Sequence, residues 1–381
     1  MNSMATNVIH AADFSSPYAG NFMASLRALG EACAGQGGRM VLVLPPSAAG
    51  RPWCEQAIVA GQAVRFVSPT APLLRRAAAL ASVAAAEHAT ILHSHFCAYD
   101  VAAWLAQLLL RLRGRRLRVV WHSHSEVPVR KTLPGRVRDF LKYRCMGRSV
   151  RMIAVSGHVR EELIAAGFSA PRVRAILNGI DLDRATCAGR QKAEVLAGLG
   201  MGPDQRLLFM IGRDPLLKGV DFALAAVREL VEEGRRVVLG ILGEEPLREY
   251  LDGQGIGESC PWVRVIAPTE DIASYYQAAT VFLSASRTEG FSYAACEALA
   301  NGIPLAAGDI LGWASECPSA RLCAAADGPA LADAVRTILD WPEEECRRRC
   351  REGRDFIRRD FDVRHWAQQV ADYYQEILGQ P

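Results

Sequence analysis

Several features that mark specialised protein classes are missing from this sequence. Its 11 cysteines form no Cys-x-x-Cys pair and no regular framework, so we expect free thiols in a reducing compartment. Residues 1–20 contain no apolar core of a secretory signal, and no uncharged apolar run reaches the ~18 residues of a transmembrane helix. These absences predict a cytoplasmic protein.

Two signatures of phosphate and metal chemistry are also missing. The chain has no Gly-x-x-x-x-Gly-Lys-[Ser/Thr] loop, which excludes a P-loop NTPase, and no Asp-x-Asp pair stands at the end of a predicted strand. We therefore predict no metal site and no required cofactor.

The composition indicates a globular protein of two domains. The chain has 381 residues, of which half are apolar and 22% are charged. This length exceeds one ordinary core and suits two domains of average size. The 32 glycines and the many short apolar runs indicate an α/β protein with many turns.

The net charge of +3 conceals one strongly basic region. Residues 111–151 contain 13 lysines and arginines against two acids, Glu126 and Asp139, so this region carries +11 and the rest of the chain about −8. Solvated helix faces explain such a region, and so does a surface that meets anionic lipid or an anionic acceptor. Nucleic acid is the weakest alternative, because no known nucleic-acid-binding module is present.

Short β-type runs alternate with helical runs twice along the chain. The first series has predicted strands at 7–11, 40–44, 63–67, 90–93, 118–122, 152–155 and 173–177, with helices among them at 20–34, 73–87, 101–112 and 157–166. After a turn at 177–181, the second series has strands at 206–211, 236–242, 262–266, 281–284 and 303–306. Its helices are expected at 220–233, 271–278, 293–301 and 329–339, followed by a helical tail over 343–378. Repeated β-α-β units predict two parallel sheets, whose ligands bind at the carboxyl ends of the strands and in the cleft between two facing domains.

The segment I-G-R-D-P-L-L-K-G at 211–219 follows a predicted strand and opens a helix. Arg213 and Lys218 are five residues apart in this loop. Fixed positive charges suit a diphosphate that gains negative charge as it leaves, and a strand-to-helix loop adds backbone N–H donors. The alternative is an ordinary, solvated helix entry.

The segment R-T-E-G-F-S-Y-A-A-C-E-A-L-A-N-G-I-P at 287–304 contains two glutamates. A helix that starts near Ser292 is expected to direct its unpaired N–H groups at phosphate. Glu289 precedes this helix in the loop and is expected to face the cleft. Glu297 lies along the helix, where its carboxylate can accept from both hydroxyls of a ribose. The alternative is that Ser292 only caps the helix and that Glu297 is a surface residue.

Two predicted strands end in His-Ser-His, at 93–95 and 122–124. Alternate residues of a strand share one face, and hydrogen bonding to a substrate in the cleft is favoured over a purely structural role. Such a pair can bind zinc, but no third ligand follows it in the sequence. The loop at 15–21 adds Gly20 and Asn21 as weaker candidates for phosphate contact at a helix N-terminus.

Taken together, these motifs resemble the retaining, nucleotide-sugar-dependent glycosyltransferases of family 4, also called group 1. The resemblance covers nearly the whole chain and is most specific at N-G-I-D (178–181), G-R-x4-K-G (212–219) and E-G-F-x5-E-A-L-A-N-G-I-P (289–304). V-S-G-H-V-R-E-E-L (155–163) adds to it. The chain looks most similar to the exopolysaccharide and capsular-polysaccharide branch.

The resemblance implies a GT-B fold of two Rossmann-like domains. Residues 1–178 would form the acceptor-side domain, 179–360 the domain that binds the nucleotide sugar, and 361–381 a helix that packs back on the first domain. The implied catalytic residues are His122, Arg213, Lys218 and Glu289. The implied donor-binding residues are Gly20, Arg213, Lys218, Ile266, Gly290, Phe291, Ser292, Tyr293 and Glu297. The acceptor-side residues are His95, His124 and Asn21, with His124 as the substitute for His122.

Two departures from the family pattern concern the pocket. A single Gly20 stands where many members have Gly-Gly, and Gly308-Asp309-Ile310-Leu311-Gly312-Trp313, followed by Glu316, replaces the usual Gly-Gly-x-x-Glu. The first departure weakens the expected phosphate contact, and the second is expected to reshape the pocket of the transferred sugar.

The implied function is transfer of a sugar, with retention, from a nucleotide diphosphate sugar, most readily a UDP-sugar. The acceptor would be a hydroxyl group of a saccharide, a small molecule or a lipid-linked saccharide in polysaccharide biosynthesis, with peripheral contact at the inner membrane face through residues 111–151. The alternatives are a nucleotide-sugar epimerase on the same fold and a non-catalytic protein that binds a sugar nucleotide. Consumption of donor without acceptor would indicate the first, and binding without turnover the second.

Overall fold

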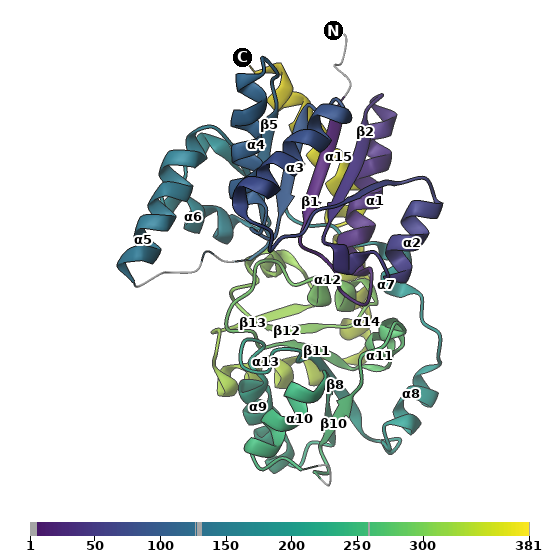
Figure 1. Cartoon of the computed structure of the whole chain (residues 1–381). Helices are drawn as coiled ribbons and strands as arrows, with labels where there is room; N and C mark the ends of the chain where they lie inside the picture. The colour runs from purple at the N-terminus through teal and green to yellow at the C-terminus, as the bar shows by residue number, and fades with distance from the viewer. Residues whose placement is uncertain (1–5, 126, 128–131, 258–259, 381) are drawn as a thin grey trace. The chain divides into compact units, whose positions relative to one another are not determined.

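The computed structural model describes residues 6–125, 127, 132–257 and 260–380. The chain divides into unit 1, which comprises Met1–Gly179 and Val363–Pro381, and unit 2, which comprises Ile180–Asp362 (Figure 1). Three charged residues of the basic region, Glu126, Arg130 and Lys131, lie outside the described residues. Each unit contains one parallel sheet with helices, so the predicted α/β class with two Rossmann-like domains is confirmed.

Unit 1 is built on a seven-stranded sheet in the order β3-β2-β1-β4-β5-β6-β7. Its strands are β1 (Asn7–Ala12), β2 (Arg39–Leu44), β3 (Ala63–Phe66), β4 (Ile91–His95), β5 (Arg118–Ser123), β6 (Arg151–Ala154) and β7 (Val173–Ala175). Its helices are α1 (Gly20–Gly35), η1 (Pro46–Ala48), α2 (Pro52–Val59), α3 (Leu73–Ala86), α4 (Asp100–Leu112), α5 (Leu133–Asp139), η2 (Phe140–Cys145), η3 (Met146–Arg148), α6 (Gly157–Ala165), η4 (Ala170–Arg172) and α15 (Val363–Gly379).

One face of this sheet packs against α1 and α15. Val8, Ile91 and Val120 from three neighbouring strands share a buried cluster with side chains of both helices. Since alternate residues of a strand point to the same face, His10, His93, His95 and His122 also lie on this face. On α15 the buried positions Val363, Trp366, Ala367, Val370, Ala371, Tyr373, Tyr374 and Ile377 recur at helical spacing.

Unit 2 is built on a six-stranded sheet in the order β10-β9-β8-β11-β12-β13. Its strands are β8 (Arg206–Ile211), β9 (Val237–Leu242), β10 (Val263–Ile266), β11 (Val281–Ser284), β12 (Leu305–Gly308) and β13 (Ala320–Cys323). Its helices are α7 (Leu182–Thr186), α8 (Lys192–Gly198), α9 (Val220–Glu232), α10 (Glu245–Gly253), α11 (Ile272–Ala278), α12 (Tyr293–Ala300), η5 (Gly312–Glu316), α13 (Gly328–Leu339) and α14 (Glu343–Asp360). Side chains of α9, α10 and α13 share one buried cluster with β8, β9 and β11.

The strand order of each sheet reverses between two neighbouring strands. The chain runs outward from β1 through β2 to β3, then returns to β4 on the other side of β1, and β8 and β11 have the same relation in unit 2. In α/β proteins, the carboxyl ends of two strands at such a reversal point are a common place for ligands to bind.

Some elements differ from the sequence prediction. The edge strand β13 was not predicted, because its four residues A-R-L-C include three half-buried positions and show no strong strand pattern. The short helices α2, α5, α7, α8 and α10 were also missed. Strand β4 continues two residues further than predicted, through His95, because its ladder with β5 extends to the pair His95–His122.

A testable consequence concerns the two glycines that flank α9. Gly219 has a φ of +66°, and a Cβ on it would lie 1.9 Å from the carbonyl oxygen of Ala285 at the end of β11, whereas Gly234 has a φ of +83° and open space around it. Gly234→Ala should lower the free energy of unfolding by about 1–2 kcal/mol, the cost of the left-handed conformation alone. Gly219→Ala should lower it at least twice as much, measured by urea unfolding. Equal losses would contradict the close approach of loop and strand.

Candidate functional site

Arg287 ties together the loops that follow β8 and β11 at the reversal point of unit 2. Its guanidinium group donates to both carboxylate oxygens of Asp221, at 2.8 and 2.5 Å, and to the Leu216 carbonyl at 2.6 Å. Its backbone N–H donates to the Leu217 carbonyl at 2.9 Å. The hydrogen bonds from Arg287 lower the pKa of Asp221. The two loops are therefore fixed against each other before any ligand arrives.

The predicted diphosphate-binding cation and the predicted sugar-facing carboxylate form an ion pair across these loops. The ammonium group of Lys218 donates to Glu289 at 2.7 Å, and the two side chains are 34% and 11% exposed. Arg213 is exposed on the same loop as Lys218, and within the described part of the chain it makes no hydrogen bond or ion pair. Unit 2 thus presents one paired cation and one unpaired cation beside the end of β8.

The N-terminus of α12 follows directly from Glu289 and Gly290. Ser292 adopts a left-handed conformation with a φ of +57°, and its hydroxyl accepts from the backbone N–H of Ala295 at 3.4 Å. Such a conformation in a non-glycine residue costs of order 1–3 kcal/mol and persists only where the surroundings enforce it. It sets the direction in which α12 begins at Tyr293.

Phe291, which precedes Ser292, is packed among other aromatic side chains. Phe291 is 3% exposed, and its ring centroid lies 5.6 Å from that of Trp313, 5.8 Å from that of Phe361 and 5.4 Å from that of Tyr293. Trp313 belongs to the segment that departs from the family pattern at 308–313. This departure therefore places an indole against the loop that carries Glu289, while Glu316 is exposed.

Glu297 is a buried, paired carboxylate, so the alternative of a surface residue is wrong. Its side chain is 7% exposed, accepts from the Tyr276 hydroxyl at 2.9 Å and forms an ion pair with Arg184. Burial raises the pKa of Tyr276 well above its usual value, so this phenol stays a donor. The Asp181 side chain of the N-G-I-D motif accepts from the backbone N–H of Arg184 at 3.1 Å and so starts α7, which carries Arg184. Ribose binding by Glu297 remains a prediction that must share the carboxylate with these two partners.

Three other predicted residues lie at strand ends or helix starts. Ile266 ends β10, is buried, and accepts at its carbonyl from the backbone N–H of Gly243 at 3.0 Å. Gly20 begins α1 with a φ of +56° and open space around the position of a Cβ, so its backbone conformation is what favours glycine. Asn21 is buried one residue later. Gly20 and Asn21 lie in unit 1, and Ile266 in unit 2.

In unit 1 the reversal point carries a row of five histidines. His93 pairs in register with His10, and His95 with His122 on the next strand; His124 follows just after β5. The rings of His122 and His124 stack with their centroids 4.1 Å apart. All but His124, which is half-buried, are at most 2% exposed. The predicted acceptor-side residues His95, His122 and His124 are therefore brought together.

Hydrogen bonds connect four of these histidines through a tyrosine of α15. The Tyr374 hydroxyl lies 2.5 Å from Nδ1 of His93 and 3.5 Å from Nε2 of His10. Nδ1 of His10 lies 2.9 Å from Nε2 of His95, and Nδ1 of His95 lies 2.9 Å from Nε2 of His124. His122 stands apart, because neither of its ring nitrogens has a hydrogen-bond partner among the described residues.

Sequence reasoning missed the partners of the predicted residues. These partners are His10 and Tyr374 in unit 1 and Arg184, Asp221, Tyr276 and Arg287 in unit 2. His93 belongs to the quoted segment at 93–95 but was not assigned a role of its own. A signal existed for two of the missed partners: His10 lies in the predicted strand 7–11, and Arg287 begins the quoted motif at 287–304. Tyr374 gave no signal, because 364 residues separate it from His10.

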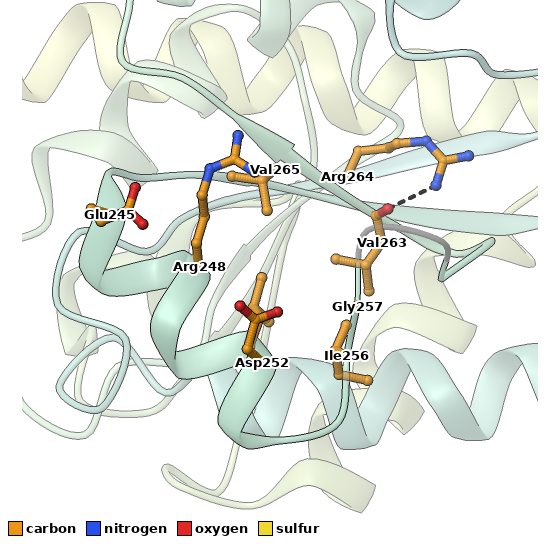
Figure 2. A pocket seen from close by; sticks show the side chains of 9 residues that line it. Glu245, Arg248, Asp252, Ile256, Gly257, Val263, Arg264 and Val265 are labelled. Atoms are coloured by element: carbon orange, nitrogen blue, oxygen red, sulfur yellow. Dashed lines mark hydrogen bonds between the residues drawn. The ribbon is translucent and has the colours of Figure 1, made fainter.

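A surface pocket in unit 2 lies apart from these residues. It has a volume of about 480 Å³ and lies between α10 and the edge strand β10. Figure 2 shows Glu245, Arg248 and Asp252 of α10 on one side and Arg264 on the other, with the Arg264 guanidinium donating to the Val263 carbonyl at 2.7 Å. Strands β9 and β8 separate β10 from β11. None of the predicted site residues lines this pocket.

Comparison with known proteins matches each series of elements to a glycosyltransferase family model. Residues 24–184 match the model described as Glycosyltransferase Family 4, and residues 205–340 match the model described as Glycosyl transferases group 1. The chain is 28% identical over 275 residues to D-inositol 3-phosphate glycosyltransferase 1 of Catenulispora acidiphila, which covers 66% of this chain and 64% of that protein. It is 30% identical over 235 residues to GDP-mannose-dependent alpha-(1-6)-phosphatidylinositol dimannoside mannosyltransferase of Mycobacterium tuberculosis, covering 61% and 58%. The matches thus span less than two thirds of either relative.

Among solved structures, Anabaena HepE in complex with UDP shares the fold. It aligns with a TM-score of 0.79 at 15% identity, over 97% of this chain and all of that one. Within the described residues, we find no helix that is both long enough and apolar enough to cross a membrane.

The histidine row predicts a loss of stability in mild acid. Burial lowers the pKa of His10 and of His124 to about 3, and burial also lowers those of His93, His95 and His122 well below the usual value. In the unfolded chain these histidines bind protons below about pH 6.5, whereas in the native state they remain neutral to a much lower pH. Stability should therefore be level above pH 6.5 and fall as the pH drops towards 3, by up to about 1.4 kcal/mol per histidine and pH unit.

Urea unfolding at pH 8, 7, 6 and 5.5 measures this dependence. His365→Gln, a change of an exposed histidine on α15, is the control and should leave the pH profile unchanged. A free energy of unfolding that stays level between pH 7 and 5.5 would contradict a neutral, buried row.

Proposed function

Because the chain belongs to the family 4 (group 1) glycosyltransferases, we propose that it transfers a sugar from a nucleotide diphosphate donor to a hydroxyl acceptor with retention of the anomeric configuration. The observation that carries this proposal is the pair Lys218–Glu289 beside the exposed Arg213, fixed at the reversal point of unit 2. The two cations, Arg213 and Lys218, and the N-terminus of α12 suit a diphosphate. The carboxylate of Glu289 suits the hydroxyls of a sugar.

Donor binding would proceed by an exchange of partners. The diphosphate competes with Glu289 for Lys218, and Glu289 is released to accept from hydroxyls of the transferred sugar. Glu297 accepts hydrogen bonds from the ribose hydroxyls in one of two ways. It uses the carboxylate lone pairs that the Tyr276 hydroxyl does not occupy, or those that become available when Arg184 moves away. The contacts of the nucleotide are assigned to Ile266, Gly290, Phe291, Ser292 and Tyr293, and phosphate contact in unit 1 to Gly20.

In the transfer step the acceptor oxygen bonds to the anomeric carbon as the bond from that carbon to the diphosphate oxygen breaks. The electron pair stays on the diphosphate, where Arg213 and Lys218 neutralise the developing charge, so we propose that this step needs no metal or other cofactor. The acceptor proton goes to a diphosphate oxygen on the same face. His95, His122, His124 and Asn21 are assigned to the acceptor and hold its hydroxyls by hydrogen bonds.

The donor nucleotide is proposed to be UDP. HepE is described as a complex with UDP, whereas the mannosyltransferase relative is named for GDP-mannose. A thermal-shift screen of UDP-, GDP- and ADP-sugars identifies the nucleotide, because a ligand that binds only the native state raises the melting temperature. Release of nucleoside diphosphate that depends on an added acceptor then distinguishes transfer from epimerisation and from binding alone.

Alanine at either donor cation should remove most of the turnover. Loss of one electrostatic donor to a leaving group costs ~3–4 kcal/mol, so Arg213→Ala and Lys218→Ala should each reduce kcat about a hundredfold or more. Release of nucleoside diphosphate at saturating donor measures this. Arg236→Ala is the control, because Arg236 is 71% exposed and pairs with Asp204 on the surface. Near-normal turnover in both variants would contradict the proposed donor site.

We further propose that the acceptor is a lipid-linked saccharide and that α5 and η2 meet an anionic membrane surface. Leu133, Val137, Phe140 and Leu141 are between 46% and 73% exposed, and Arg136 and Arg138 are exposed among them. A short helical segment that exposes apolar and basic side chains together suits the interface of an anionic bilayer. Lys142 is not part of this surface, because it pairs with Asp100 at 2.8 Å and is 16% exposed.

The membrane proposal is tested by vesicle flotation. The wild-type chain should float with vesicles that contain anionic lipid and bind weakly to neutral vesicles, and the double change Leu133→Ser and Phe140→Ser should abolish flotation. Val59→Ser on α2 is the control, because Val59 is 88% exposed outside the basic region. Flotation that is the same with both kinds of vesicle, or unchanged in the double variant, would contradict a lipid contact at α5 and η2.

A further inference from the structure

The histidine row of unit 1 contains more imidazole nitrogens than its hydrogen bonds use. His95, His122 and His124 each offer one ligand atom, and these three atoms lie within 4.8 Å of one another. The sequence shows only a His-x-His pair at 122–124, for which no third ligand follows along the chain. The sheet supplies that third ligand, because β4 runs beside β5 and pairs His95 with His122.

We propose that His95, His122 and His124 bind one divalent transition-metal ion of the Zn²⁺ class. The ion would occupy ring nitrogens that the proposed sugar transfer assigns to the acceptor, so metal and acceptor would compete for them. Three neutral imidazoles with a fourth position left to water or another ligand form a known type of zinc site. Imidazole also suits Cu²⁺, Ni²⁺ and Co²⁺, whereas the hard ions Mg²⁺ and Ca²⁺ prefer oxygen ligands.

The separations of the ligand atoms favour this trio. Ligand nitrogens at 2.0–2.1 Å from a tetrahedral zinc lie about 3.3 Å from one another. Nδ1 of His95 and Nε2 of His124 are already 2.9 Å apart. The widest separation in the trio, up to 4.8 Å, has to shrink by about 1.5 Å, and rotation of the His122 ring is the movement that achieves it.

His122 provides an independent indication. It is 2% exposed, and neither ring nitrogen has a hydrogen-bond partner among the described residues. A buried polar group without a partner costs about 1–3 kcal/mol, so such groups mark a missing ligand or a functional role. A metal ion bound to one nitrogen would satisfy the lone pair that the protein leaves unused.

The hydrogen bonds behind His95 fit a metal ligand. If Nδ1 of His95 binds the ion, its Nε2–H can donate to Nδ1 of His10, and Nε2–H of His10 can donate to the Tyr374 hydroxyl. The Tyr374 hydroxyl then donates to Nδ1 of His93. Each N–H or O–H from His95 through His10 to Tyr374 therefore has an acceptor, and the series ends at His93. His10, as the hydrogen-bond partner of the ligating His95, would fix the tautomer of that imidazole.

A second trio competes for the same ion. Ligand atoms of His10, His93 and His95 also lie within 4.8 Å of one another. All three of these residues are at most 1% exposed, whereas His124 is half-buried. The outer trio therefore leaves a way in for the ion and a place for its fourth ligand, and binding there keeps the hydrogen bonds of His10 and Tyr374.

The test uses the full chain without a histidine tag, stripped with a chelator and titrated with Co²⁺ and with Zn²⁺. We expect one equivalent of Co²⁺ to bind, with the visible absorption of a tetrahedral site, and Zn²⁺ to displace it. His122→Gln and His124→Gln should each weaken Zn²⁺ binding more than hundredfold. His10→Gln should weaken it about tenfold to hundredfold, as the loss of an outer partner does. His365→Gln should leave it unchanged.

Melting curves of each variant in metal-free buffer separate a lost ligand from a lost fold. A variant that keeps its melting temperature without metal but loses the rise caused by Zn²⁺ supports the site. Wild-type protein that binds no Co²⁺ or Zn²⁺ overturns the proposal. Binding that survives His122→Gln and His124→Gln but disappears in His93→Gln overturns it as well, because it moves the ion to the inner trio. These readouts need no donor or acceptor, so they stand apart from the test of sugar transfer.

Discussion

The reversal of strand order in each parallel sheet is the constraint on which the candidate sites depend. The strand order reverses between β1 and β4 and again between β8 and β11, and the carboxyl ends of such strand pairs are where α/β proteins commonly bind ligands. His10 and His95 come from the first pair of strands, and Lys218 and Glu289 from the loops after the second. The strand order therefore brings residues that are distant in the chain close together at these two points.

In unit 2 the glutamates of the E-x7-E motif are already paired with cations. Glu289 is held by Lys218, and Glu297 by Arg184 and Tyr276, and both carboxylates are largely buried. A buried carboxylate without a partner would be costly, so removal of Lys218 or Arg184 would destabilise the unliganded protein. A donor that binds as proposed therefore has to exchange partners with these groups, and only the difference between the two sets of contacts would contribute to its affinity.

Patterns of neighbouring residues predicted the bounds of individual strands. The apolar strands Arg206–Ile211 and Val281–Ser284 were predicted to the residue, because both are bounded by clear turn signals and buried on both faces. Contacts between distant segments gave no such pattern: Tyr374 meets His93 across 281 residues, and Arg184 meets Glu297 across 113. The motif at 287–304 identified its two glutamates. Which cations pair with them, Lys218 with Glu289 and Arg184 with Glu297, depends on how other loops pack. The position of Trp313 against Phe291 likewise depends on tertiary packing.

The histidine row shows why a polar series can persist inside an apolar core. It shares its face of the sheet with Val8, Ile91 and Val120 under α1 and α15, where each imidazole needs a partner for its N–H and for its lone pair. Tyr374, His10, His95 and His124 provide those partners for one another in series, so the cost of burial is largely offset along that line. His122 lies beside the series without joining it. Its two unpaired ring nitrogens add a cost that an apolar side chain would not, so the stability of the sheet does not account for this imidazole, whereas a bound ligand would.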